Sequence, residues 1–155
     1  MIQWRLGALT TIVTLLVSCS SAPNGTDPAA LEANASARIL MIPSARPEKY
    51  RSLIGARGWQ NPYLIVKTGG VALLDPDNHE EVLFRPEELT QALGKLPPSA
   101  WPYGRVVAVT ENGVRVPGDD APIRKNRAIV AGTLESLHVL IHWIPRCLMK
   151  PCTAP

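Results

Sequence analysis

Two histidines and two cysteines near the C-terminal end are the side chains whose types and spacing bear most on chemistry. They are His138, His142, Cys147 and Cys152, in the pattern H-x3-H-x4-C-x4-C. Zinc takes nitrogen and sulfur ligands in tetrahedral sets, and residues four apart share one face of a helix or a strand. His138 and His142 are therefore candidate metal ligands. The spacing of the four residues fits no known zinc motif, however, so no metal is assigned. In an oxidising compartment Cys147 and Cys152 are instead expected to form a disulfide, with free thiols as the alternative.

The third cysteine, Cys19, follows an N-terminal apolar run. Arg5 precedes 13 residues without charge, from Leu6 to Ser18. A bilayer-spanning helix needs about 20 apolar residues, so this run fits the hydrophobic region of a signal peptide better than a permanent span. The four residues Leu16-Val17-Ser18-Cys19 resemble the lipobox of bacterial lipoproteins.

This resemblance implies cleavage between Ser18 and Cys19 and the attachment of fatty acids to Cys19. Several acyl chains give a stable membrane anchor, whereas a single chain gives only marginal binding. The residue directly after Cys19 is Ser20 rather than an aspartate, and this resembles the pattern that sorts such lipoproteins to the outer membrane. We therefore expect a lipid-anchored protein on the periplasmic side of a bacterial outer membrane. Ordinary secretion, with cleavage after Ala22, is the alternative.

Composition limits the remaining classes of protein. The chain has 155 residues, 46% hydrophobic and 19% charged, with a formal net charge of +3. These values indicate one globular domain, and the positive bias is too weak to indicate nucleic-acid binding, which normally shows a concentrated basic stripe. The sequence has no nucleophile elbow, phosphate loop, dinucleotide-binding glycine pattern or His-Glu-x-x-His motif. We expect no cofactor and favour a non-catalytic binding or scaffold protein over a small secreted metal-dependent enzyme using His138 and His142.

The chain divides into four expected parts. Residues 1–18 are expected as the signal peptide, and residues 19–37 as a flexible tether rich in small and polar residues, with a weak helical turn at 28–37 as the alternative for that part. The globular domain is expected at 38–145, followed by a C-terminal tail at 146–155.

The domain is expected to alternate strands and helices. Short apolar runs predict strands, and apolar residues at i, i+3, i+4 and i+7 predict helices. The expected strands are 39–42, 63–67, 71–74, 81–84, 106–110, 114–116 and 139–144, and the expected helices are 86–96 and 121–137. From residue 63 onward the predicted fold class is α+β in β-β-α-β-α-β order, with two layers: a small mixed β-sheet and two helices on one face.

From Tyr63 to Ile144 this order is similar to that of the periplasmic domain of the ExbD/TolR biopolymer-transport family. The matching parts are the hairpin at 63–74, the helices at 86–96 and 121–137, and the strands at 106–110 and 139–144. The family also has a membrane helix with an essential acidic residue, which the apolar run of this sequence lacks, so a motor role is not expected. The resemblance implies an envelope domain that binds peptidoglycan or an envelope protein, and it leaves pairing into a homodimer open.

Overall fold

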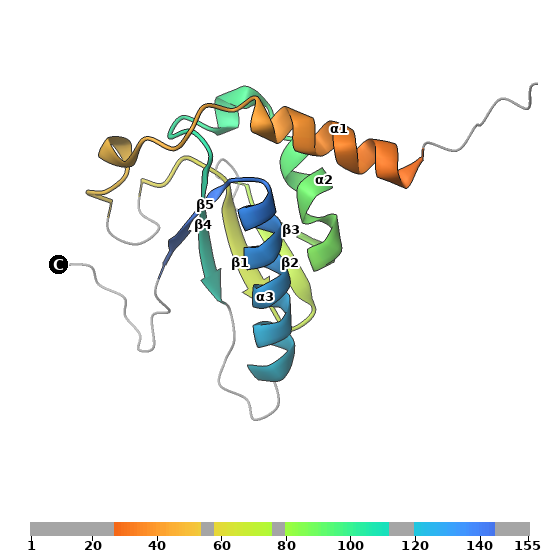
Figure 1. The fold of residues 1–155 in the computed structure, drawn as a ribbon. Helices are drawn as coiled ribbons and strands as arrows, with labels where there is room; N and C mark the ends of the chain where they lie inside the picture. Colours follow the sequence, from red (N-terminus) through yellow and green to blue (C-terminus); the bar gives the residue numbers. More distant parts are fainter. Residues whose placement is uncertain (1–26, 54–57, 76–79, 112–119, 145–155) are drawn as a thin grey trace, which may run out of the picture.

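The computed structural model describes residues 27–53, 58–75, 80–111 and 120–144, which form a five-stranded sheet with three α-helices (Figure 1). The elements in chain order are α1 (Pro28–Leu40), β1 (Tyr63–Lys67), β2 (Gly70–Leu74), β3 (Glu81–Phe84), α2 (Leu89–Gly94), β4 (Val106–Glu111), α3 (Asp120–Ser136) and β5 (Leu140–Trp143). Short 3-10 helices lie at Pro47–Lys49, Pro86–Glu88 and Pro98–Ala100. The predicted α+β class is confirmed.

The sheet is mixed, with the strand order β3-β2-β1-β4-β5. Strands β1, β2 and β3 form an antiparallel meander, whereas β4 lies parallel to β1 and β5 lies parallel to β4. Gly70 follows the first turn at a φ of 151°, and a Cβ there would lie 2.5 Å from the carbonyl oxygen of Phe84. Only glycine fits at this close approach of β2 and β3.

The main core lies between the sheet and the helices. The chain passes from β3 to β4 through α2, and from β4 to β5 through α3. Both connections join parallel strands and move towards the β5 edge of the sheet. Because such crossovers are right-handed, they place both helices on the same face of the sheet. Figure 1 shows α3 lying over the sheet, and its residues Ile123, Val130 and Leu134, together with Leu137 just after it, are buried. The strands supply Leu64, Val66, Val71, Val107 and Val109 to the same cluster.

The opposite face of β4 is covered by aromatic side chains. Val106 and Ala108 pack in a second cluster with Tyr50, Trp59 and Tyr103, which come from the connecting segments. The two clusters account for the continuous apolar run of β4, because successive residues of a strand point to opposite faces.

Asn61 fixes these connecting segments to the sheet. It is 3% exposed, and its side-chain amide donates to the carbonyls of Gly104 at 2.8 Å and Val106 at 2.7 Å. Its Oδ1 accepts from the N–H of Tyr103 at 2.8 Å. The Asn61 side chain therefore continues the β1–β4 ladder beyond the first residue of β1.

Helix α1 is the main difference from the sequence-based expectation. It covers part of the segment 19–37, expected as a flexible tether, and its last residues were expected to begin an edge strand at 39–42. The carboxylate of Asp27 caps the helix by accepting from the N–H of Ala29 at 3.0 Å, and Pro28 occupies its first turn. The ordered fold thus begins before residue 38.

Packing explains why the apolar run at 39–42 begins as a helix. Ile39 is fully buried in the main core cluster. Ala35, one turn earlier, lies against Gly94 of α2. These contacts outweigh the local preference of the run for a strand, and the only strand-like pairing nearby among the described residues is a single parallel bridge between Ser44 and Arg105.

Several predicted features lie outside the described residues. They are the signal peptide, Ser18, Cys19, the strand at 114–116, Cys147, Cys152 and the tail at 146–155. Within the ranges that are described, no helix has both the length and the apolar character needed to cross a bilayer.

Candidate functional site

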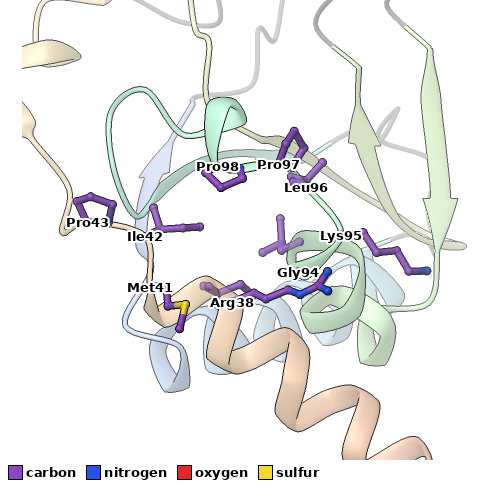
Figure 2. A pocket seen from close by; sticks show the side chains of 11 residues that line it. Arg38, Met41, Ile42, Pro43, Gly94, Lys95, Leu96, Pro97 and Pro98 are labelled. Carbon is purple, nitrogen blue, oxygen red and sulfur yellow. The ribbon is translucent and has the colours of Figure 1, made fainter. Parts of the chain in front are cut away.

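An apolar groove lies between α1 and α2 (Figure 2). Its inner pocket has a volume of about 370 Å³ and is lined on one side by the segment that follows α2. An outer pocket of about 580 Å³ continues along both helices. The two pockets share the lining residues Arg38, Met41, Gly94 and Lys95 and together are called the α1–α2 groove; each has a volume in the usual range of ligand sites.

Local sequence features shape this groove. A Cβ on Gly94 would lie 2.6 Å from the Cβ of Ala35, so the two helices approach this closely because one has glycine and the other alanine. Pro97 and Pro98 prevent α2 from continuing and line the inner pocket. The apolar lining further includes Ile42 from the segment after α1.

The charges at the groove have one sign. Arg38 and Lys95 line both pockets and are exposed, and no aspartate or glutamate is among the lining residues. In Figure 2 the Arg38 side chain extends across the opening towards α2, whereas the Lys95 side chain points outward. Met41, at 84% exposed, is the most exposed of the large hydrophobic residues described. An apolar groove with two cations at its rim can bind an apolar group that carries a nearby carboxylate or another anion.

His138, a metal candidate from the sequence, ends helix α3. Its φ is 53°, in the left-handed region, and its N–H donates to the carbonyl of Glu135 at 2.9 Å. The N–H of Val139 donates to the carbonyl of Leu134, also at 2.9 Å. This pair of bonds is the Schellman motif, in which the left-handed residue terminates the helix. The position of His138 therefore has a backbone role, and its side chain is exposed.

His142, the second candidate, lies on β5 within the aromatic cluster. Its ring stacks on Trp59 with centroids 5.1 Å apart and an interplanar angle of 6°, and it meets Tyr50 edge-on at 5.8 Å. The helix end at His138 separates the two histidines into different elements, so their four-residue spacing does not put them on one regular face. No group of three or more His, Cys, Asp or Glu side chains suited to a metal occurs in the described ranges.

The segment after α1 carries the basic residues Arg46, Lys49 and Arg51. The side chains of Arg46 and Lys49 both donate to the carbonyl of Pro102, at 3.4 and 3.3 Å. These bonds attach the segment that carries Tyr50 to the loop before β4. Arg46 and Lys49 thus have a structural role, which favours this role over an anion-binding surface.

The groove residues Arg38, Met41 and Lys95 were not singled out from the sequence. One signal was present: Gly94 interrupts an apolar helical pattern, and a glycine there often has a packing reason. The partner segment is 59 residues away, from Gly94 to Ala35, so the sequence pattern alone does not identify it.

Comparison of the chain with models of protein families, with curated proteins and with solved structures found no match in any of the three.

Proposed function

We propose that this protein is a non-catalytic, lipid-anchored binding domain of a bacterial cell envelope, and that its α1–α2 groove holds an apolar segment of an envelope protein. The observation that carries the binding role is the pair of adjoining, mainly apolar pockets with Arg38 and Lys95 at their rim. The anchor is supported by the resemblance of Leu16–Cys19 to a lipobox.

A short spacer would limit the distance between the anchor and the start of α1. Cys19 precedes Asp27, the cap of α1, by eight residues. Eight residues span at most about 28 Å when fully extended, so α1 would start within that distance of the bilayer surface. A partner in or near the same membrane would then be within reach of the groove.

The chemistry of the groove favours a protein segment over peptidoglycan. Glycan hydroxyl groups held against Ile39, Met41 and Leu93 would lose hydrogen bonds to water without gaining partners. An amphipathic helix instead places apolar side chains from successive turns into such a groove. An aspartate, glutamate or C-terminal carboxylate on that segment would complement Arg38 and Lys95.

Mass spectrometry of the native polypeptide tests the anchor. The expected N-terminus is Cys19 bearing fatty acids, and Cys19→Ser is expected to move the protein out of the membrane fraction. An N-terminus at another residue, or a Cys19 without acyl groups, would overturn the lipid-anchored assignment.

Site-specific photo-crosslinking in cells tests the groove. A photoreactive residue at Met41 is expected to capture one envelope protein through an apolar segment with a nearby carboxylate, whereas a probe at the exposed Lys49 is not. A synthetic peptide of that segment should bind the purified protein, and Arg38→Glu with Lys95→Glu should weaken its binding by roughly tenfold or more. Equal capture from both positions, or capture of a polar segment, would refute this role. So would binding to isolated peptidoglycan with an affinity that the two charge reversals leave unchanged.

A further inference from the structure

Strand β3 forms an open edge of the sheet with apolar residues on both faces. It is the end strand of the order β3-β2-β1-β4-β5. Its central residues Val82 and Leu83 are 62% and 57% exposed. Edge strands normally carry charges, prolines or a covering segment at such positions, since their free backbone groups can pair with another chain.

The hydrogen-bond pattern shows which backbone groups face outward. The N–H of Asp75 donates to the carbonyl of Glu80 at 2.8 Å, so these residues form a hydrogen-bonded pair next to the β2–β3 register. Hydrogen-bonded and non-hydrogen-bonded pairs alternate along an antiparallel ladder. The N–H and C=O of Val82 therefore point to β2, and those of Glu81 and Leu83 point to the open edge.

We propose that β3 pairs antiparallel with β3 of a second copy of this chain, about a two-fold axis at Val82. Glu81 of each copy then exchanges two backbone hydrogen bonds with Leu83 of the other, giving four bonds in total. Val82 faces Val82 across the axis, on the side of the sheet that carries the helices. Phe84, on that same side, already packs against the main core cluster, so the pairing extends an existing apolar row.

Neighbouring registers are disfavoured by groups on the same strand. A shift that places Glu81 opposite Glu81 sets Val82 against Glu80 of the other copy, and it brings together two carboxylates that each already pair with Lys67 of their own chain. The opposite shift, centred on Leu83, requires the backbone of Arg85. That N–H already donates to Glu88 Oε2 at 2.9 Å, and the Arg85 carbonyl accepts from the Glu88 N–H at 2.9 Å.

The other edge strand, β5, is a poorer candidate. The guanidinium of Arg127 lies 4.4 Å from the ring centroid of Trp143, so this apolar side chain already has a partner. The chain after β5 also leaves the described ranges. A pairing through β3 involves four residues per copy, so a weak, reversible dimer is expected. This inference does not depend on the lipid anchor or on the groove.

Engineered cysteines test the pairing and its register. In the full-length chain with Cys19→Ser, Cys147→Ser and Cys152→Ser, so that no native thiol remains, Val82→Cys should give a disulfide dimer on mild oxidation, because facing residues of a non-hydrogen-bonded pair have Cα atoms about 4.5 Å apart. Leu83→Cys is the matched control. In this register the two Leu83 positions are offset by two residues along the strands, beyond the about 7 Å limit for a disulfide. The yield from Val82→Cys is expected to be at least roughly tenfold higher.

Leu83→Pro removes an outward N–H while leaving the β2–β3 bonds intact. Added to Val82→Cys, it should lower the disulfide yield about tenfold without changing the far-ultraviolet circular dichroism. Equal yields from the two cysteine variants, or a higher yield from Leu83→Cys, would overturn the proposal. The native chain gives an independent measurement: amide hydrogen exchange of Glu81 and Leu83 should slow as protein concentration rises. If it does not slow at concentrations up to the solubility limit, the proposal fails even where a variant misfolds.

Discussion

Replacing Gly94 by alanine is expected to destabilise the protein, although alanine normally favours a helix over glycine. The new Cβ would lie 2.6 Å from the Cβ and 2.8 Å from the Cα of Ala35. Carbon atoms pack best at about 3.5–4.0 Å, so α1 must move away from α2. Overpacking of this kind costs about 1–3 kcal/mol, and the gain in helix propensity offsets at most about 1 kcal/mol. From the middle of the overpacking range, about 2 kcal/mol, the expected net loss is about 1–2 kcal/mol.

Gly132 supplies the matched control for this prediction. It lies within α3, is exposed, and has no atom within 4 Å of the position where a Cβ would be. Gly132→Ala should therefore show only the helix-propensity effect and raise the free energy of unfolding by about 0.5–1 kcal/mol. The two substitutions are chemically identical and differ only in what surrounds the added methyl group.

Urea denaturation followed by circular dichroism measures both changes. At about 4 °C per kcal/mol, thermal melting should show Gly94→Ala lower by about 4–8 °C and Gly132→Ala higher by about 2–4 °C. Amide exchange of α1 should also accelerate in Gly94→Ala. If Gly94→Ala stabilises the protein as Gly132→Ala does, α1 does not pack on α2 at this point, and the groove loses one of its walls.

Three further predictions concern the rest of the fold. Asn61→Ala leaves three buried backbone groups without their side-chain partner and should cost about 2–4 kcal/mol in urea unfolding, whereas the exposed neighbour Gln60→Ala should stay within about 0.5 kcal/mol. His138→Gly should raise the free energy of unfolding by up to about 1 kcal/mol, because glycine adopts a positive φ without strain; His138→Val should lower it, and the opposite order would contradict the Schellman motif. The side-chain hydrogen bond from Arg85, together with the Arg85 backbone N–H, lowers the pKa of Glu88, so its contribution to stability is present above the unfolded pKa of about 4.3 and is lost as pH falls through the folded pKa. Melting between pH 7 and pH 2 should show this loss in the native chain and a smaller one in Glu88→Gln.

The sequence predicted those elements whose signals are local. The five strands of the sheet are short apolar runs bounded by turns, and α2 and α3 have apolar stripes at helical spacing. Helix α1 was predicted only in part, because Pro28–Leu40 is rich in small residues and has a narrow apolar stripe. Its stability depends on burial of Ile39 and on contact with Gly94, both of which involve residues distant in the sequence.

The candidate site was harder to predict for the same reason. Arg38 and Lys95 are brought to one groove only by the packing of two helices. The spacing of His138 and His142 suggested that both side chains share one face. That rule holds only for residues four apart within one helix or one strand. The left-handed turn at His138 ends α3, and His142 belongs to β5.

Helix α1 links the two halves of the proposed function. It is the first described element after Cys19, and it forms one wall of the groove. Binding in the groove therefore requires α1 to be docked on α2, and any fraction of undocked molecules raises the apparent Kd in proportion. Gly94→Ala should weaken binding of the captured peptide more than Gly132→Ala. Once molecules with undocked α1 predominate, the apparent Kd should rise by up to about tenfold for each 1.4 kcal/mol lost from the free energy of docking α1 on α2. Unchanged affinity in a Gly94→Ala protein with demonstrably exchanging α1 would show that the ligand binds elsewhere.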